Sequence, residues 1–161
     1  MKWSDVNLSE LTFTEKRGGG VKISPLLRFQ IPTGRVMYDG ISSFSSITLE
    51  MPEHFISWWY ELEKALGQEP FRSNVSNGGL RIKVDQATQF FDESRKSIFP
   101  ELTEGSLKGD TLSCIIEVPS VYYYQNMYGL VVRMYQGVVR TRAPDAPSGC
   151  LFLNEDETPD P

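Results

Sequence analysis

Residues 121–142 hold five of the seven tyrosines of the chain together with three arginines. Hydrophobic and polar residues alternate from residue 130 onward, which indicates that the segment ends in a β-strand. Aromatic rings stack on unpaired bases and cationic groups bind phosphates, so this combination on a sheet predicts a surface for single-stranded nucleic acid. The alternative for each tyrosine is a place in the core or at a sheet edge, because tyrosine is a common strand residue.

The alternation puts Arg133 and Tyr135 on the solvent-facing side of the predicted last strand. Gly137 then interrupts the pattern, and a glycine inside a strand often marks a bulge or a bend. A bulge that absorbs one residue there would bring Arg140 and Arg142 to the face of Arg133. A regular strand would split the arginines between two faces, so the prediction of one cationic face depends on the bulge.

Other candidate binding residues come from an earlier strand and from the tyrosine cluster. Arg81 and Lys83 alternate with apolar residues, so we expect them on the open side of a half-buried strand. Of the three consecutive tyrosines, Tyr122 and Tyr124 share one face and Tyr123 takes the other. The predicted nucleic-acid-binding residues are Arg81, Lys83, Phe91, Lys108, Tyr122, Tyr124, Tyr128, Arg133, Tyr135, Arg140 and Arg142, with Arg95 and Lys96 on an adjoining loop.

The elements that carry these residues are mostly strands. Strands are predicted within residues 9–51 and 80–142, and a helix over residues 52–66, where Pro52 suits the first helical position and Gly67 suits the C-terminal cap. The helix has one apolar stripe, formed by Phe55, Trp59, Leu62 and Leu66. We therefore expect a mainly β fold, an OB-like small antiparallel barrel capped by one α-helix. A β-sandwich with a helix is the alternative.

Composition and charge limit the possible classes. The chain has 161 residues, 40% of them hydrophobic, and a net charge of −5. Four of its acidic residues lie in the last eight residues. We expect one globular domain over residues 1–153 and a disordered acidic tail over residues 154–161. No long apolar run and no signal peptide are present, which predicts a soluble, intracellular protein without membrane contact.

Enzymatic chemistry is not indicated. The single histidine, His54, has no nucleophile motif around it, and no group of carboxylates suggests a metal-dependent nuclease. Cys114 and Cys150 are far apart and form neither a metal-binding pair nor a disulfide framework. The sequence therefore predicts a protein that is not an enzyme, with no catalytic residue, no metal and no cofactor.

Several segments together resemble the single-stranded-DNA-binding proteins of large nucleocytoplasmic DNA viruses. They are PLLRFQIPTGRV at residues 25–36, LRIKVDQATQFFD, LKGDTLSCIIEVPSVYYYQNMYGLVVRMYQGVVR and the acidic tail. The shared elements are a turn at 30–32, Lys108-Gly109 before a strand, the aromatic cluster at 121–124, Tyr128-Gly129 and Gln136. Ile31 departs from the pattern, in which a threonine is expected. The resemblance implies an OB-like fold, a role in DNA replication, recombination or repair, and a location at the site of viral DNA replication in the host cytoplasm or nucleus.

The expected partner is single-stranded DNA. RNA, replication proteins that bind the acidic tail, and a second copy of the chain in a homo-oligomer remain possible further partners. The tail lacks the terminal aromatic residue of the bacterial proteins. The rival hypothesis is a non-enzymatic structural or interaction protein, an assembly or scaffold subunit that uses its aromatic surface for protein contacts. Salt separates the two hypotheses, because binding to phosphates weakens steeply as salt rises.

Overall fold

The computed structural model describes residues 1–17, 19–66, 69–98 and 104–141. Within these ranges an eleven-stranded sheet curves around helix α1 (Glu53–Leu66). Two short 3₁₀-helices, Trp3–Asp5 and Leu8–Glu10, come first. The strands are β1 (Thr12–Glu15), β2 (Val21–Gln30), β3 (Gly34–Arg35), β4 (Ser46–Glu50), β5 (Phe71–Arg72), β6 (Val75–Ser76), β7 (Gly79–Lys83), β8 (Gln89–Phe91), β9 (Ser97–Ile98), β10 (Thr111–Tyr124) and β11 (Met127–Thr141).

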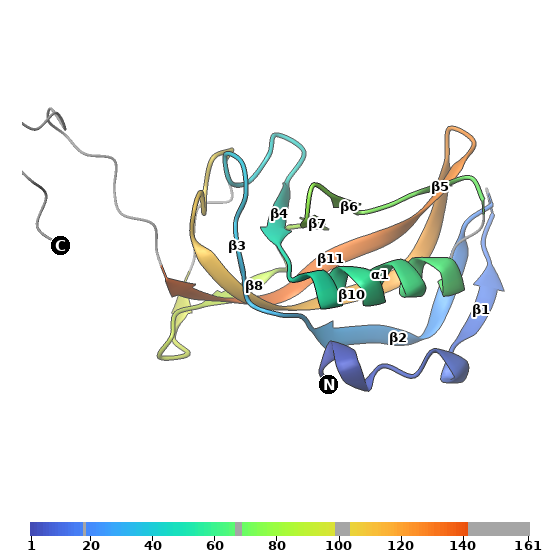
Figure 1. The fold of residues 1–161 in the computed structure, drawn as a ribbon, viewed down its shortest axis with the longest axis horizontal. Helices are drawn as coiled ribbons and strands as arrows, with labels where there is room; N and C mark the ends of the chain where they lie inside the picture. Colours follow the sequence, from blue (N-terminus) through green and yellow to red (C-terminus); the bar gives the residue numbers. More distant parts are fainter. Residues whose placement is uncertain (18, 67–68, 99–103, 142–161) are drawn as a thin grey trace, which may run out of the picture.

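The main path of the sheet is β1-β2-β10-β11-β7-β4. Its consecutive pairs are antiparallel except for β11 and β7, and β11 also pairs in parallel with β5 and β8. Figure 1 shows β10 and β11 running most of the length of the molecule beside α1. The prediction of a mainly β, OB-like fold with one helix is confirmed, and the parallel pairings make the sheet mixed rather than wholly antiparallel.

Helix α1 begins one residue after the predicted start, because the carbonyl of Pro52 accepts the N–H groups of Phe55 and Ile56. The predicted stripe of Phe55, Trp59, Leu62 and Leu66 is buried against the inner face of the sheet, as expected. Trp3 packs on this helix, with its ring 5.2 Å from those of Phe55 and Trp58. The N-terminal segment therefore helps to close the core. The predicted cap, Gly67, lies outside the described residues.

One detail of the chain before β4 differs from expectation. Phe44 falls within the range 9–51 in which strands were predicted, yet it is 87% exposed in a turn that precedes β4. Ser42 Oγ accepts the backbone N–H groups of Phe44 and Ser46, and these bonds hold the turn. Serine hydroxyls that bond to the backbone nearby compete with strand formation.

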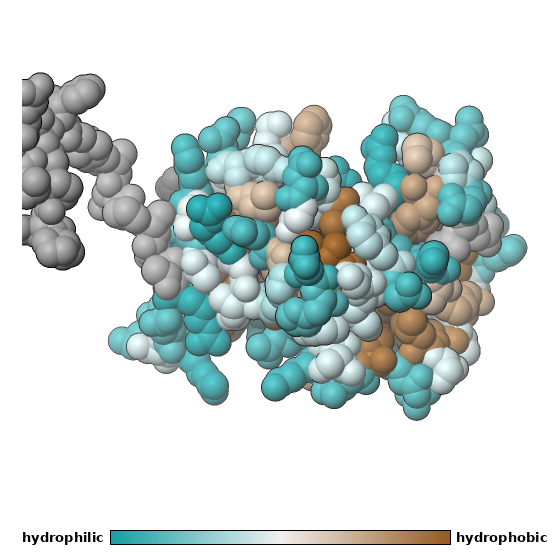
Figure 2. Space-filling view, in the orientation of Figure 1, coloured by the Kyte–Doolittle hydropathy of each residue, from teal (hydrophilic) through white to brown (hydrophobic). Residues whose placement is uncertain are grey.

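In the view of Figure 2 the surface is mostly hydrophilic, and hydrophobic residues gather at the lower right, over the region of β1 and β2.

Among the described residues, no helix is long and apolar enough to cross a membrane. Burial raises the pKa of the Cys114 thiol to about 12, so this cysteine stays protonated at neutral pH. Cys150, Arg142 and the predicted acidic tail at 154–161 lie outside the described residues.

A buried carboxylate joins α1 to the chain that follows it. Glu63, 5% exposed, accepts hydrogen bonds from Ser73 Oγ (2.6 Å) and from the backbone N–H of Asn74 (3.3 Å). Burial raises the pKa of Glu63 above its ordinary value, and the two hydrogen bonds offset part of the rise. The native state therefore binds this proton more tightly than the unfolded chain does.

This shift predicts how stability changes with pH. The free energy of unfolding should fall as pH rises from the unfolded pKa of Glu63, about 4.3, through its raised native pKa. Glu63→Gln removes the titration, so the stability of the wild type relative to this variant should decrease across that window and level off above it. Urea unfolding of both proteins over a pH series measures the difference. A difference that grows with pH would contradict the shift.

Candidate nucleic-acid interface

The face of the sheet opposite α1 carries a row of charged residues. Arg28 on β2 pairs with Glu117 on β10, Glu117 pairs with Arg133 on β11, and Arg133 pairs with Lys83 on β7. Directly paired residues point to the same side of a sheet, so the four side chains share one face. We call this the open face. The neighbouring residues on the same strands point to the core and are buried, namely Phe29, Ile116, Val132 and Ile82.

Glu117 is the centre of this row. Its residue is 4% exposed, and its Oε2 accepts hydrogen bonds from Arg28 Nη2 (2.8 Å) and Arg28 Nε (3.1 Å). Arg133 lies between two carboxylates, with Nη1 3.6 Å from Glu117 Oε1 and Nη2 3.4 Å from Asp85 Oδ2. The hydrogen bond to Glu117 raises the pKa of Arg28. With Lys83, the group holds three cations and two carboxylates, so it keeps one net positive charge, and the charge of Arg133 is largely compensated.

Tyr135 lies next to this row because β11 bulges. Ile116 pairs with Met134 whereas Ile115 pairs with Gln136, so Tyr135 is the extra residue. The bulge therefore precedes the predicted position at Gly137 by two residues. It brings Arg140 to the face of Arg133, as predicted, whereas the prediction for Arg142 lies outside the described residues. The guanidinium carbon of Arg28 lies 3.9 Å from the centroid of the Tyr135 ring.

The turn between β10 and β11 brings two tyrosines and an arginine together. Tyr122 pairs with Gly129 and Tyr124 with Met127, and alternation along β11 puts these pairs on the face of Arg133. Gly129 also pairs with Arg72 on β5. Arg72, Tyr122 and Tyr124 line a hollow of about 340 Å³. A side chain at Gly129 would overlap the ring of Tyr122, so glycine lets that ring lie flat on the strand.

The structure does not bring Tyr128 to the open face. Tyr128 pairs with Tyr123 on the other side of the hairpin, and their ring centroids are 4.7 Å apart. Tyr128 packs against the hydrophobic core, whereas Tyr123 donates a hydrogen bond from its hydroxyl to Asn126 Oδ1 (3.2 Å). The sequence-based expectation that Tyr123 faces away from Tyr122 and Tyr124 agrees with this pairing. Tyr128 differs from the other predicted residues because it is one position out of phase with Arg133.

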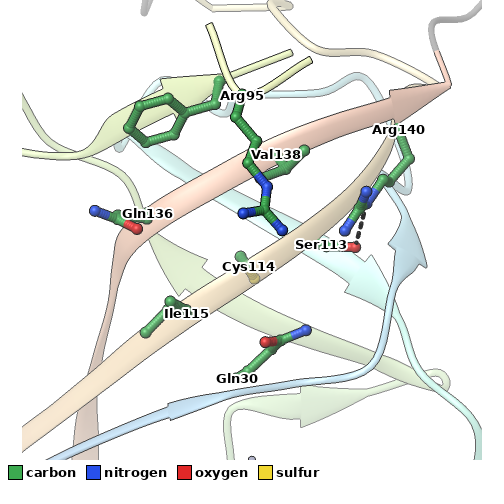
Figure 3. Close-up of a pocket in the computed structure, with 9 residues that line it drawn as sticks. Gln30, Arg95, Ser113, Cys114, Ile115, Gln136, Val138 and Arg140 are labelled. Atoms are coloured by element: carbon green, nitrogen blue, oxygen red, sulfur yellow. Dashed lines mark hydrogen bonds between the residues drawn. The ribbon is translucent and has the colours of Figure 1, made fainter. Parts of the chain in front are cut away.

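A second hollow, of about 320 Å³, lies toward the far end of β11. Figure 3 shows Arg95, from the loop between β8 and β9, and Arg140, from β11, beside this hollow. Arg140 Nε donates a hydrogen bond to Ser113 Oγ (3.0 Å), which fixes the direction of its guanidinium. The described side chains that line the hollow include Gln30, Phe91, Arg95, Ser113, Gln136 and Arg140. Apolar side chains with donor groups at the rim suit a base or a phosphate.

The remaining predicted residues, Arg81 and Lys108, lie toward a third part of the surface. Arg81 is on the open side of β7 and lines a hollow of about 440 Å³ with Tyr38 and Phe44, which are 61% and 87% exposed. Lys108 Nζ lies 3.4 Å from Asp39 Oδ1 in the neighbouring loop. Two exposed aromatic rings beside a cation extend the same type of surface beyond the strands.

Several residues of this interface, among them Arg28, Arg72 and Tyr38, were absent from the sequence-based prediction. Arg28 lies between the apolar residues Leu27 and Phe29, so strand alternation could have predicted its exposure. No signal in the sequence indicated that it pairs with Glu117. Arg72 comes from a strand of two residues. Tyr38 was missed because it lies in a turn. In the described ranges, no group of three or more histidine, cysteine, aspartate or glutamate side chains is arranged to hold a metal ion.

Comparisons with known proteins bear on the fold. No family model and no curated protein matches the sequence. A C-terminal truncation of the single-stranded DNA-binding protein from bacteriophage Enc34 has a TM-score of 0.52 and 17% identity, covering 88% of this chain and 98% of that chain. A second structure of that phage protein gives 0.52 and 17% over 90% and 96%. Its complex with single-stranded DNA gives 0.50 and 18% over 87% and 99%.

At this identity the likeness establishes the fold. The chain has the fold of these phage single-stranded DNA-binding proteins, in agreement with the OB-like architecture of the sheet. The resemblance to proteins of large nucleocytoplasmic DNA viruses receives no support from these structures and stays a prediction.

Proposed function

We propose that this protein binds single-stranded DNA without sequence preference along the open face. The observation that carries the proposal is the arrangement along β10 and β11. Tyr122, Tyr124 and Arg72 lie near the turn, Tyr135 lies beside the charged row, and Arg140 lies near the far end. Rings for bases alternate with cations for phosphates over one continuous pair of strands, as unpaired nucleic acid requires. The fold shared with the phage proteins supports the same function.

The proposed mechanism is stoichiometric rather than catalytic. Tyr122 and Tyr124 stack on bases, while Lys83, Arg81 and Arg140 contact phosphates together with Arg142, which lies outside the described residues. Arg133 has a smaller share of phosphate binding, because Asp85 and Glu117 already compensate its charge. Phe91 contributes an apolar wall of the far hollow, and Lys108 lies outside the central track. Stacking needs only the face of a base, so RNA is a second ligand to test.

The wider role that we propose is protection of single strands during viral-type DNA replication, recombination or repair. It rests on the resemblance to the proteins of large nucleocytoplasmic DNA viruses, and it implies an intracellular protein at the site of viral DNA replication. The acidic tail at 154–161 is proposed to recruit replication proteins or to compete with DNA for the open face.

One observation favours the rival function, an assembly or scaffold subunit. Exposed apolar side chains outside the open face include Phe13 on β1, which is 49% exposed. Exposed aromatic groups are also enriched at protein contacts. Such an interface would depend little on salt, so the same titration separates both functions.

The test is a titration of fluorescent oligo-dT with the full chain at two salt concentrations, with a duplex of equal length as the control. We expect tighter binding to the single strand and a slope of log K against log salt of about −0.7 for each phosphate contact. Absence of binding at low salt, also after removal of residues 154–161, would overturn the proposal and favour the rival function.

A further inference from the structure

We infer that the outer face of the Arg28 guanidinium is a stacking site for one unpaired base, with Tyr135 as the layer beneath it and Glu117 as the residue that positions it. The inference rests on the proposed function and adds a binding residue at the centre of the open face. Its ligand class is a nucleobase, recognised by its π-face.

Two contacts fix the orientation of the Arg28 guanidinium plane. Arg28 Nε and Nη2 both donate to Glu117 Oε2, at 3.1 and 2.8 Å, so the carboxylate fixes the edge of the group. The guanidinium carbon lies 3.9 Å from the centroid of the Tyr135 ring, so the ring supports the group from one side. The Arg28 side chain keeps 43% of its surface exposed. A planar, weakly hydrated cation held in this way is suited to stack on a further aromatic ring.

A base is not expected to displace Arg28 and stack directly on Tyr135. Displacement would break both hydrogen bonds to Glu117, whose side chain is only 6% exposed. The carboxylate would keep only Arg133, whose Nη1 is 3.6 Å away. Leaving a buried acceptor with fewer partners is unfavourable, above all for a charged group. The base therefore adds to the existing pair as a third layer.

A phosphate is also a poor ligand for Arg28. The Nε–H group and one Nη2–H group already bind Glu117, and that carboxylate would repel a phosphate brought to the same edge. What Arg28 offers to solvent is its face rather than its full set of donors. Lys83, which makes no ion pair with a described carboxylate, provides the contrasting type of contact in the same row.

The test compares Arg28→Lys with Lys83→Ala in the oligo-dT titration. Arg28→Lys keeps the charge and loses the planar group, so we expect binding to weaken about tenfold, with an unchanged salt slope. Lys83→Ala should reduce the salt slope by about 0.7, because it removes a phosphate contact. On an abasic oligonucleotide of the same length, the tenfold effect of Arg28→Lys should disappear, because no base is left to stack.

A second pair of variants tests the supporting ring. Tyr135→Leu should weaken binding because the supporting ring is lost, and the conservative variant Tyr135→Phe, which keeps the ring, should rescue most of this loss. Thermal unfolding of each variant verifies that it is folded. Wild-type affinity in Arg28→Lys, with a reduced salt slope in Arg28→Ala, would make Arg28 a phosphate contact and overturn the inference while the proposed function stands. Failure of the wild type to bind single strands would overturn both.

Discussion

Replacing both Tyr122 and Tyr124 by alanine should weaken the binding of oligo-dT by at least about thirtyfold. Each engaged base contributes roughly 1 to 3 kcal/mol through stacking, and the two rings lie on the same face of the β10–β11 hairpin. Tyr124 is 66% exposed at the edge of the hollow that it shares with Arg72. Fluorescence titration at constant salt measures the loss, and the salt slope should not change.

Tyr123→Ala is the matched control for this variant. Tyr123 is the residue between the two, and it is also exposed, but its ring points to the other side of the hairpin and packs on Tyr128. Its replacement should leave affinity within about threefold of the wild type, because no base stacks on that side. An equal loss of affinity in Tyr123→Ala and in the double variant would mean that DNA contacts both faces of the hairpin. That result would contradict the assignment of the open face.

Trp59→Ala should lower the free energy of unfolding by about 3 to 5 kcal/mol. Trp59 is fully buried on α1, where the helix meets the inner face of the sheet. Removing an indole at this place leaves a cavity, and the packed strands cannot collapse into it. For a chain of this size, the loss corresponds to a fall in Tm of roughly 6 to 20 °C. Thermal and urea unfolding measure both quantities.

Trp58→Ala controls for the loss of a tryptophan as such. Trp58 is the next residue on α1, but it is only partly buried, between Trp3, Phe29 and Phe55. A smaller cavity remains there because solvent reaches the site, so the destabilisation should be less than half that of Trp59→Ala. An equal or larger effect of Trp58→Ala would mean that the contact with the N-terminal segment, rather than the stripe of α1, dominates the stability of the core.

The sequence was sufficient for features that depend on local periodicity. The stripe on α1 and the alternation around Arg133 each require only the repeat of a helix or a strand, and both agree with the structure. The position of the bulge was two residues off. The sequence signal was Gly137, whereas the register shift falls at Tyr135, because a bulge is defined by pairing with another strand.

Features that depend on pairing between distant segments could not be predicted. Arg28 and Glu117 are 89 positions apart in the sequence, and only the pairing of β2 with β10 brings them together. The same holds for the parallel contacts of β11 and for Arg72, which reaches the tyrosines through a strand of two residues. Tyr128 was assigned to the binding surface by its residue type, but the phase of β11 turns it toward the core.

The hairpin of β10 and β11 also sets a length scale. β11 has 15 residues, which at about 3.3 Å per residue gives a curved path of roughly 50 Å. Residues of this one hairpin line part of both end hollows of the proposed track, together with residues of β2, β5, β8 and the loop after β8. The length of the hairpin therefore sets the distance between the two hollows, and in the proposed complex it limits the number of nucleotides that one molecule covers. The footprint should therefore be constant over a wide range of protein concentration, within the roughly 4 to 16 nucleotides known for OB folds. The length of the hairpin, rather than the amount of protein, would then set the number of nucleotides that each molecule binds.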